Sequence, residues 1–157
     1  MTGPAPAAPP RFLCLNGPNL GALGRREPAL YGQATLAELE HRLRARATEL
    51  GVAVDCRQSN HEGQLVDWLE EAGDALGAIC NPGGLAHTSV VLRDAFTTFG
   101  RPVVEVHLTN VHAREPFRQR LVTAGAARGL ISGLGTDGYL LALEALCDMT
   151  IRSRGTT

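Results

Sequence analysis

The chain has 157 residues, 44% hydrophobic and 20% charged, with a net charge of −1. This length suits one domain with its own core, and the charge balance lacks the basic excess of a general nucleic-acid binder, so no nucleic-acid partner is expected. All 15 basic residues are arginines. The absence of lysine excludes Schiff-base lysines, pyridoxal-phosphate enzymes and the lysine of phosphate-binding P-loops.

The cysteines show no spacing typical of a zinc site. There are four, at Cys14, Cys56, Cys80 and Cys147, and three of them lie in short apolar runs, where a buried unpaired thiol is the ordinary state. The sequence shows no secretory leader and no apolar run of about 18 residues. We therefore expect a cytoplasmic protein with no membrane partner.

Residues 1–10 are rich in Pro and Ala without periodicity and predict a disordered tail before a single domain over residues 11–152. Hydrophobic periodicity in that domain predicts strands at residues 11–16, 52–57, 78–81, 102–108 and 129–134, and helices at residues 35–50, 64–71, 87–98 and 139–151. Such alternation favours a parallel sheet covered on both faces. The predicted fold class is α/β: a flavodoxin-like, doubly wound, five-stranded parallel sheet in three layers (α/β/α).

The helix predicted at residues 35–50 has the clearest boundary signal. Thr35 followed three residues later by Glu38 matches the capping-box pattern, in which each side chain binds the other residue's backbone N–H. Leu36, Leu39 and Leu43 share one face of this helix. The pattern predicts an amphipathic helix that packs on the sheet through its leucines.

Polar residues follow three of the predicted strands, at the edge where ligands bind in open parallel sheets. Asn16-Gly17-Pro18-Asn19 follows the first strand, and the third ends at Asn81-Pro82-Gly83-Gly84. Near the end of the fourth, Glu105, His107 and Thr109 alternate with apolar residues. The period of two places them on one side of the chain, so that Glu105 can orient the His107 imidazole. We predict a functional site at this edge.

The segment from residue 19 to 33 is long for a connection and contains several glycines. Long loops with glycines and little structure of their own are typical of functional lids. The segment also carries Arg25, Arg26 and Tyr31. A guanidinium close to the tyrosine hydroxyl in a partly dry site would favour the phenolate. The alternative interpretation is a solvent-exposed basic turn.

Two other motifs indicate binding chemistry only weakly. Residues 133–138 match G-x-G-x-x-G, but the 19 residues that follow are too few for the rest of a dinucleotide-binding unit. His107 and His112 are five residues apart and belong to no H-E-x-x-H pattern. We therefore predict neither a dinucleotide nor a metal site.

Taken together, these residues resemble the type II 3-dehydroquinate dehydratases. The resemblance runs from about residue 11 to 148, in the blocks LNGPNLGALGRREPALYG, RQSNHEGQLVDWL, NPGGLAHTSVVLRDA, VVEVHLTNVHAREPFR and GLGTDGYLLAL. It implies reversible dehydration of 3-dehydroquinate to 3-dehydroshikimate in the shikimate pathway, by anti elimination through an enolate, without metal or organic cofactor. It also implies a homododecamer built as a tetramer of trimers. Type I enzymes for the same reaction need an imine-forming lysine, which this chain lacks.

The resemblance assigns roles to individual residues. Tyr31 is implied as the base that removes the proton beside the ketone, Arg26 as its activator and Asn19 as the amide that holds a water against the enolate oxygen. His107 is implied as the general acid for the departing hydroxyl, oriented by Glu105. The implied substrate-binding positions are Asn81, His87, Arg118, the backbone amides of Leu108 and Thr109, and Asp94, which would be contributed across a trimer contact.

The sequence departs from the family pattern in two places. Thr109 stands where most members have Ser, and Arg120, Leu121 and Ala124 stand where many members have a His-Ser pair and a further Ser. A non-catalytic flavodoxin-like binding module or an inactive paralogue is the alternative. Against a flavin carrier, the first strand is followed by Gly-Pro-Asn-Leu instead of a Ser/Thr-rich phosphate loop.

Overall fold

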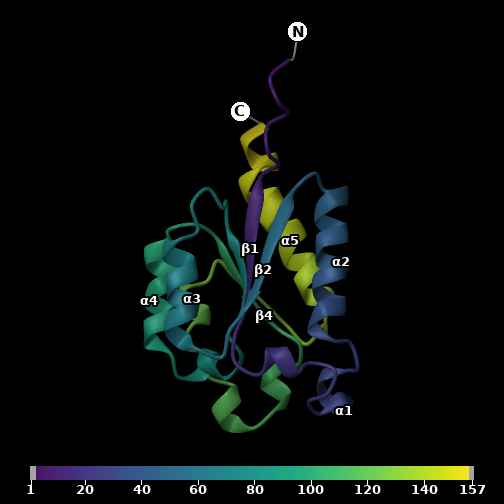
Figure 1. Cartoon of the computed structure of the whole chain (residues 1–157). Coiled ribbons are helices and arrows are strands. Elements are labelled where there is room, and N and C mark those ends of the chain that lie inside the picture. Colours follow the sequence, from purple (N-terminus) through teal and green to yellow (C-terminus); the bar gives the residue numbers. More distant parts are fainter. Residues whose placement is uncertain (1–2, 156–157) are drawn as a thin grey trace.

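The computed structural model describes residues 3–155 and contains a five-stranded, all-parallel sheet in the order β2-β1-β3-β4-β5 (Figure 1). The strands are β1 (Arg11–Asn16), β2 (Ala53–Gln58), β3 (Ala78–Asn81), β4 (Val103–His107) and β5 (Gly129–Ser132). The helices are α1 (Pro28–Tyr31), α2 (Leu36–Glu49), α3 (Glu62–Glu70), α4 (Val90–Phe99) and α5 (Asp137–Thr150). This strand order is that of flavodoxin-like folds, which confirms the predicted fold class.

Helices cover both faces of the sheet, α2 and α5 on one side and α3 and α4 on the other (Figure 1). Strand β1 shows why its sequence is apolar almost throughout. Phe12 and Cys14 are buried against α2 and α5, whereas Leu13 and Leu15 are buried against α3 and α4. A central parallel strand has no solvent-facing side, so both alternating sets must be hydrophobic.

The capping-box prediction is confirmed at the start of α2. The Thr35 hydroxyl accepts a hydrogen bond from the Glu38 N–H at 3.2 Å, and the Glu38 carboxylate accepts one from the Thr35 N–H at 2.9 Å. The helix predicted from residue 87, in contrast, begins only at Val90. Residues Gly83–His87 form a 3₁₀ turn first, and the Ser89 side chain caps α4 by accepting from the Leu92 N–H at 2.8 Å.

The segment between β1 and α2 has more structure than predicted. A 3₁₀ turn spans Leu20–Ala22, and the single turn of α1 begins with Pro28, whose fixed φ suits the first helical position. No residue of α1 is buried. Preceding β1, residues 3–10 are exposed and form neither helix nor strand, while residues 1 and 2 of the predicted tail lie outside the described residues.

Three of the four cysteines are buried and none forms a disulfide, as predicted: Cys14, Cys80 and Cys147 lie in the core and Cys56 is half-buried. Burial raises the pKa of the Cys80 thiol well above its usual value. Among residues 3–155, no helix combines the length and apolar character needed to cross a bilayer.

The end of β1 marks the edge of the sheet at which the candidate site lies. Strand β1 lies between β2 and β3, so the direction of winding reverses next to it. In register, Asn16 at the end of β1 faces Asn81 at the end of β3. Helix α1 lies at this end of the sheet, opposite the two chain termini (Figure 1). The crevice at such a reversal is where doubly wound folds bind ligands.

Candidate active site

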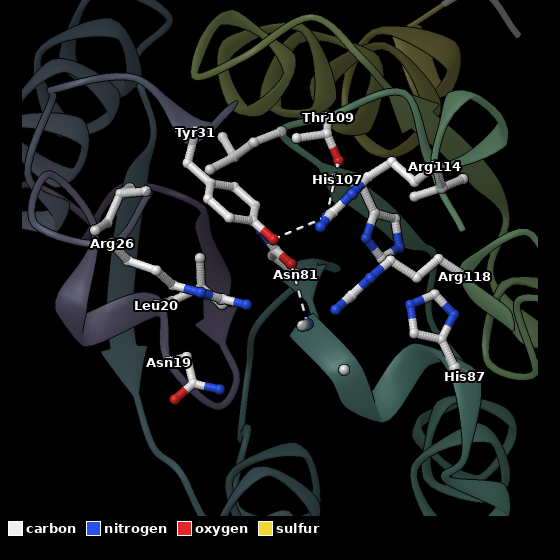
Figure 2. Close-up of a pocket in the computed structure, with 15 residues that line it drawn as sticks. Asn19, Leu20, Arg26, Tyr31, Asn81, His87, His107, Thr109, Arg114 and Arg118 are labelled. Carbon is white, nitrogen blue, oxygen red and sulfur yellow. Dashed lines mark hydrogen bonds between the residues drawn. The ribbon is translucent and has the colours of Figure 1, made fainter. Parts of the chain in front are cut away.

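A pocket lies at the carboxyl end of the sheet, between the segment after β1 and the loops after β3 and β4 (Figure 2). Most of its polar lining consists of side chains predicted from the sequence. The lining residues are Asn19, Leu20, Leu23, Arg26, Tyr31, Asn81, Gly83, Gly84, His87, His107, Leu108, Thr109, Val111, Arg114 and Arg118.

The floor of the pocket depends on two loops that approach too closely for side chains. A Cβ on Gly17 would lie 2.5 Å from the Pro82 carbonyl oxygen, and one on Gly83 would lie 2.8 Å from the Pro18 carbonyl oxygen. Gly83 also has a φ of +59°, which favours glycine. These glycines allow the ends of β1 and β3 to meet below the site.

A buried hydrogen-bond chain orients Asn81. The Tyr139 hydroxyl donates to Asn16 Oδ1 at 2.6 Å and accepts from Asn81 Nδ2 at 2.8 Å, while Asn81 Oδ1 accepts from the Gly83 N–H at 3.1 Å. Because the single Tyr139 proton is given to Asn16, the Asn81 amide must present its nitrogen to Tyr139. Burial raises the pKa of Tyr139 well above its usual value, which keeps this hydroxyl protonated. The second N–H of Asn81 is left for the pocket.

His107 and Glu105 form a buried pair on β4. Glu105 is fully buried and His107 is 6% exposed, and His107 Nε2 lies 2.7 Å from Glu105 Oε1. A carboxylate only accepts, so Nε2 carries the proton. The other ring nitrogen, Nδ1, has no hydrogen-bond partner among the described residues. The pair therefore presents a single ring position for proton exchange with a ligand.

His87 lies beside His107, with ring centroids 6.4 Å apart. Its Nδ1 lies 2.9 Å from the Arg120 carbonyl oxygen. A carbonyl only accepts, so Nδ1 carries a proton and Nε2 is the nitrogen left for a ligand. Two imidazoles held in defined tautomers thus line one side of the pocket.

Tyr31 ends α1 on the opposite side of the site, where two arginines contact it. Arg114 donates to the Tyr31 hydroxyl at 2.8 Å, and its guanidinium carbon lies 5.3 Å from the ring centroid. The Arg26 guanidinium carbon lies over the ring at 4.7 Å from the centroid (Figure 2). Two guanidinium groups thus flank the Tyr31 ring, and one of them makes a charge-assisted hydrogen bond to its hydroxyl.

Arg118 extends into the pocket from the loop after β4 (Figure 2). Its Nε lies 2.8 Å from Glu115 Oε2, yet that nitrogen makes no hydrogen bond because the approach is poorly aligned. The two groups form an ion pair that holds the aliphatic part of the Arg118 side chain in place. The guanidinium end is then available for a polar or anionic ligand.

Comparison with known proteins identifies the family of the chain. The family model "Dehydroquinase class II" matches residues 10–147. The chain is 56% identical over 134 residues to a 3-dehydroquinate dehydratase of Chelativorans sp. strain BNC1, covering 84% of this chain and 92% of the relative. The chain belongs to the class II dehydroquinase family.

Two further relatives agree with membership of the class II dehydroquinases. A 3-dehydroquinate dehydratase of Rhizobium meliloti strain 1021 is 51% identical over 147 residues, covering 93% of this chain and 99% of the relative. The crystal structure of the type II dehydroquinase from Propionibacterium acnes superposes with a TM-score of 0.85 at 40% identity, covering 88% of this chain and 97% of that one. The dehydroquinase fold thus extends over nearly the whole described chain.

Two residues that the sequence assigned to the dehydroquinase site do not line its pocket. Glu105 lies beneath the pocket and reaches it only through His107. Asp94 lies on α4 and lines a separate groove between α3 and α4. Its predicted contribution to a neighbouring subunit's site stays a prediction.

Sequence reasoning missed Arg114, although it belongs to the same block of residues as Arg118. The prediction placed only the lid arginine Arg26 beside Tyr31, whereas Arg114 is the residue that reaches the hydroxyl. The available signal was the block NVHAREPFR, in which two arginines follow β4 within one short irregular segment. In the described part of the chain, no group of three or more His, Cys, Asp or Glu side chains is placed to hold a metal ion.

Proposed function

We propose that this class II dehydroquinase dehydrates 3-dehydroquinate reversibly to 3-dehydroshikimate, a step of the shikimate pathway, by anti elimination through an enolate. Relatives that share half or more of their residues over nearly their full length carry the name 3-dehydroquinate dehydratase, which supports the reaction. The observation that carries the mechanism is the arrangement across one pocket of a tyrosine hydroxyl bound by Arg114 and a buried His107–Glu105 pair.

Tyr31 is the base in this mechanism. As the phenolate, it takes the proton from the carbon beside the ketone, and the electron pair of that C–H bond moves toward the carbonyl oxygen to give an enolate. Arg114 and Arg26 stabilise the phenolate through the hydrogen bond and the ring contact. Asn19 lines the same side of the pocket and is proposed to hold a water against the enolate oxygen.

His107 is the general acid. Collapse of the enolate re-forms the ketone, places the new double bond next to it and expels the hydroxyl group, which leaves as water after taking a proton from the imidazolium. Glu105 holds Nε2–H, so the proton comes from Nδ1. Placing base and acid on opposite sides of the pocket suits anti elimination.

The remaining polar lining is proposed to bind the substrate. Arg118, His87 and Asn81 face the pocket with a guanidinium, a ring nitrogen and an amide N–H. The backbone amides of Leu108 and Thr109, which follow β4, are proposed to bind the substrate carboxylate. A polyhydroxylated carboxylate needs donors of these kinds.

We further propose a homododecamer, built as a tetramer of trimers, in which Asp94 approaches the pocket of a neighbouring subunit. Val90 and Val91, at the start of the same helix, are 58% and 53% exposed, which supports an interface at α4. The enzyme is proposed to work in the cytoplasm, where its free cysteines would remain reduced.

A direct absorbance assay tests the proposed reaction. Purified protein mixed with 3-dehydroquinate should produce the ultraviolet absorbance of the conjugated enone carboxylate. Exhaustive chelation, or borohydride added with substrate, should leave the rate unchanged, because the proposed residues need neither a metal nor an imine. No absorbance change with folded, correctly assembled protein would contradict the proposal, as would recovery of chelated enzyme only on adding zinc.

A further inference from the structure

The segment Arg120–Thr123, in the region where the sequence departs from its family's pattern, is firmly attached beneath the pocket. The Val122 N–H donates to the Ala86 carbonyl at 2.7 Å, and Arg93 Nη1 donates to the Val122 carbonyl at 2.7 Å. These two bonds tie the segment to the turn before α4 and to α4 itself. Its last residue, Thr123, is fully buried.

The Thr123 hydroxyl meets the carboxylate that supports His107. Thr123 Oγ1 lies 2.9 Å from Glu105 Oε2, while Glu105 Oε1 lies 2.7 Å from His107 Nε2. Both contacts have a fixed direction, because a carboxylate only accepts. Each oxygen of a fully buried anion thus has one donor, and together these donors define the plane of the carboxylate. Removing either leaves a charged oxygen buried without a hydrogen bond.

We propose that Thr123 is a positioning residue for the general acid: its hydroxyl holds the Glu105 carboxylate in the plane that keeps the proton on His107 Nε2 and aims Nδ1 at the substrate. The inference rests on the proposed role of His107. Thr123 does not line the pocket and acts only through Glu105.

The neighbouring contact on the same segment favours this assignment. The Arg120 carbonyl accepts from His87 Nδ1, so one short segment fixes the tautomer of His87 directly and that of His107 through Glu105. The Arg120 contact uses the backbone and persists in side-chain variants. Thr123 is therefore the point at which the arrangement can be tested by substitution.

The principal test compares Thr123→Val, which keeps the shape and deletes the donor, with Thr123→Ser, which keeps the donor. Thr123→Val should lower kcat about 10- to 100-fold, by analogy with the loss seen when a hydrogen-bond partner that orients a metal-bound histidine is removed. KM should change less than about threefold, since Thr123 touches no substrate-binding group. Thr123→Ser should recover most of kcat.

Thr150 provides the matched control. It is a buried threonine on α5 whose hydroxyl donates to the Leu146 carbonyl at 2.7 Å, and it does not line the pocket. Thr150→Val should alter stability without altering kcat. Equal kcat losses in the two valine variants, or no loss in Thr123→Val, would overturn the inference. If Thr123→Val does not fold, Thr123→Cys, a weaker donor of similar size, must give an intermediate kcat.

A second readout does not depend on turnover. Nuclear magnetic resonance of imidazole labelled with ¹⁵N should show a protected Nε2–H on His107 in the wild type and in Thr123→Ser, but a shifted or rapidly exchanging one in Thr123→Val. An unchanged signal in Thr123→Val would overturn the positioning role even if the wild type proved inactive. In a double-mutant cycle, Thr123→Val should cost little further kcat once Glu105→Gln is present, and full additivity would contradict the proposal.

Discussion

The two sides of the pocket are built in different ways. On the acid side, Glu105 and Thr123 are fully buried, and each hydrogen bond connects groups fixed by β4 or by a loop packed against it. On the base side, Tyr31 ends a single helical turn with no buried residue, and its phenol is held by arginines from two different loops. The proposed general acid, His107, is oriented by a buried hydrogen-bond network, whereas the proposed base, Tyr31, is flanked by two positive charges.

The difference has a physical reason. An imidazole must offer one particular nitrogen, and a buried carboxylate fixes which one it offers. A phenol has only one oxygen, so its difficulty is energetic: it must lose a proton that it ordinarily holds until about pH 10. In the proposed mechanism, the guanidinium groups of Arg26 and Arg114, which come from two different loops, stabilise the anion. Substitutions on the two sides of the pocket should therefore change the kinetics in different ways.

The largest effect is expected from Tyr31→Phe, which keeps the ring that the two arginines lie against but deletes the proposed base, the hydroxyl bound by Arg114. The rate should fall by about 10²- to 10⁴-fold, the usual contribution of a general acid or base. Steady-state kinetics, with circular dichroism and sedimentation to show an unchanged fold and assembly, would measure it. A loss of less than about tenfold would exclude Tyr31 as the base.

The next largest effect should follow removal of either arginine beside Tyr31. Arg114→Gln and Arg26→Gln should each lower kcat by about 10²-fold, similar to the loss of one donor to a developing oxyanion, as steady-state kinetics would measure. Arg26→Lys keeps the charge without the planar group and should be intermediate.

Arg25→Gln is the control for these variants, because Arg25 does not line the pocket. It should leave kcat unchanged. If Arg25→Gln and Arg26→Gln showed the same loss of kcat and Arg26→Lys recovered none of it, Arg26 would only close the loop and Arg114 alone would act on Tyr31.

A smaller effect, mainly on stability, is expected from Tyr139→Phe. The change leaves Asn81 Nδ2 and Asn16 Oδ1 without their shared partner and should cost about 1–3 kcal/mol of unfolding free energy. KM should rise because Asn81 loses its orientation. Denaturant titration and kinetics measure the two effects, and an unchanged KM would exclude an orienting role for Tyr139.

The same residue gives a prediction for alkaline pH. Because burial raises the pKa of Tyr139 in the folded state, the unfolded chain loses that proton first as pH rises above about 10, and the free energy of unfolding should fall. Below that pH the contribution is fully present. Tyr139→Phe should make the decline between pH 10 and 11 shallower, and an identical slope in both proteins would contradict this.

The smallest functional effect is expected at the cysteines, which lie away from both sides of the pocket. A hydrogen bond with Cys14 lowers the pKa of half-buried Cys56, whereas burial raises the pKa of Cys80. Iodoacetamide should therefore label Cys56 first, with little change in kcat. Peptide mass spectrometry would identify the site, and faster labelling of Cys80 would contradict the predicted order.

Local patterns predicted much of this architecture. Period two placed Glu105 and His107 on one side of β4, and the capping box placed the start of α2. Such local patterns could not predict the contacts that complete the site. Arg114 meets Tyr31 across 83 residues and Tyr139 meets Asn81 across 58, so both depend on the paths of irregular loops and on tertiary packing. Thr123 lies in an irregular segment, so no periodic pattern in the sequence relates it to Glu105.

The most direct test of the division between base and acid is exchange of the substrate proton beside the ketone in heavy water. Removal of that proton needs only the base, whereas loss of water also needs the acid. His107→Gln should incorporate deuterium into unreacted 3-dehydroquinate while forming little product, and Tyr31→Phe should do neither. Deuterium incorporation by Tyr31→Phe at the rate shown by His107→Gln would contradict the assignment of the base to Tyr31.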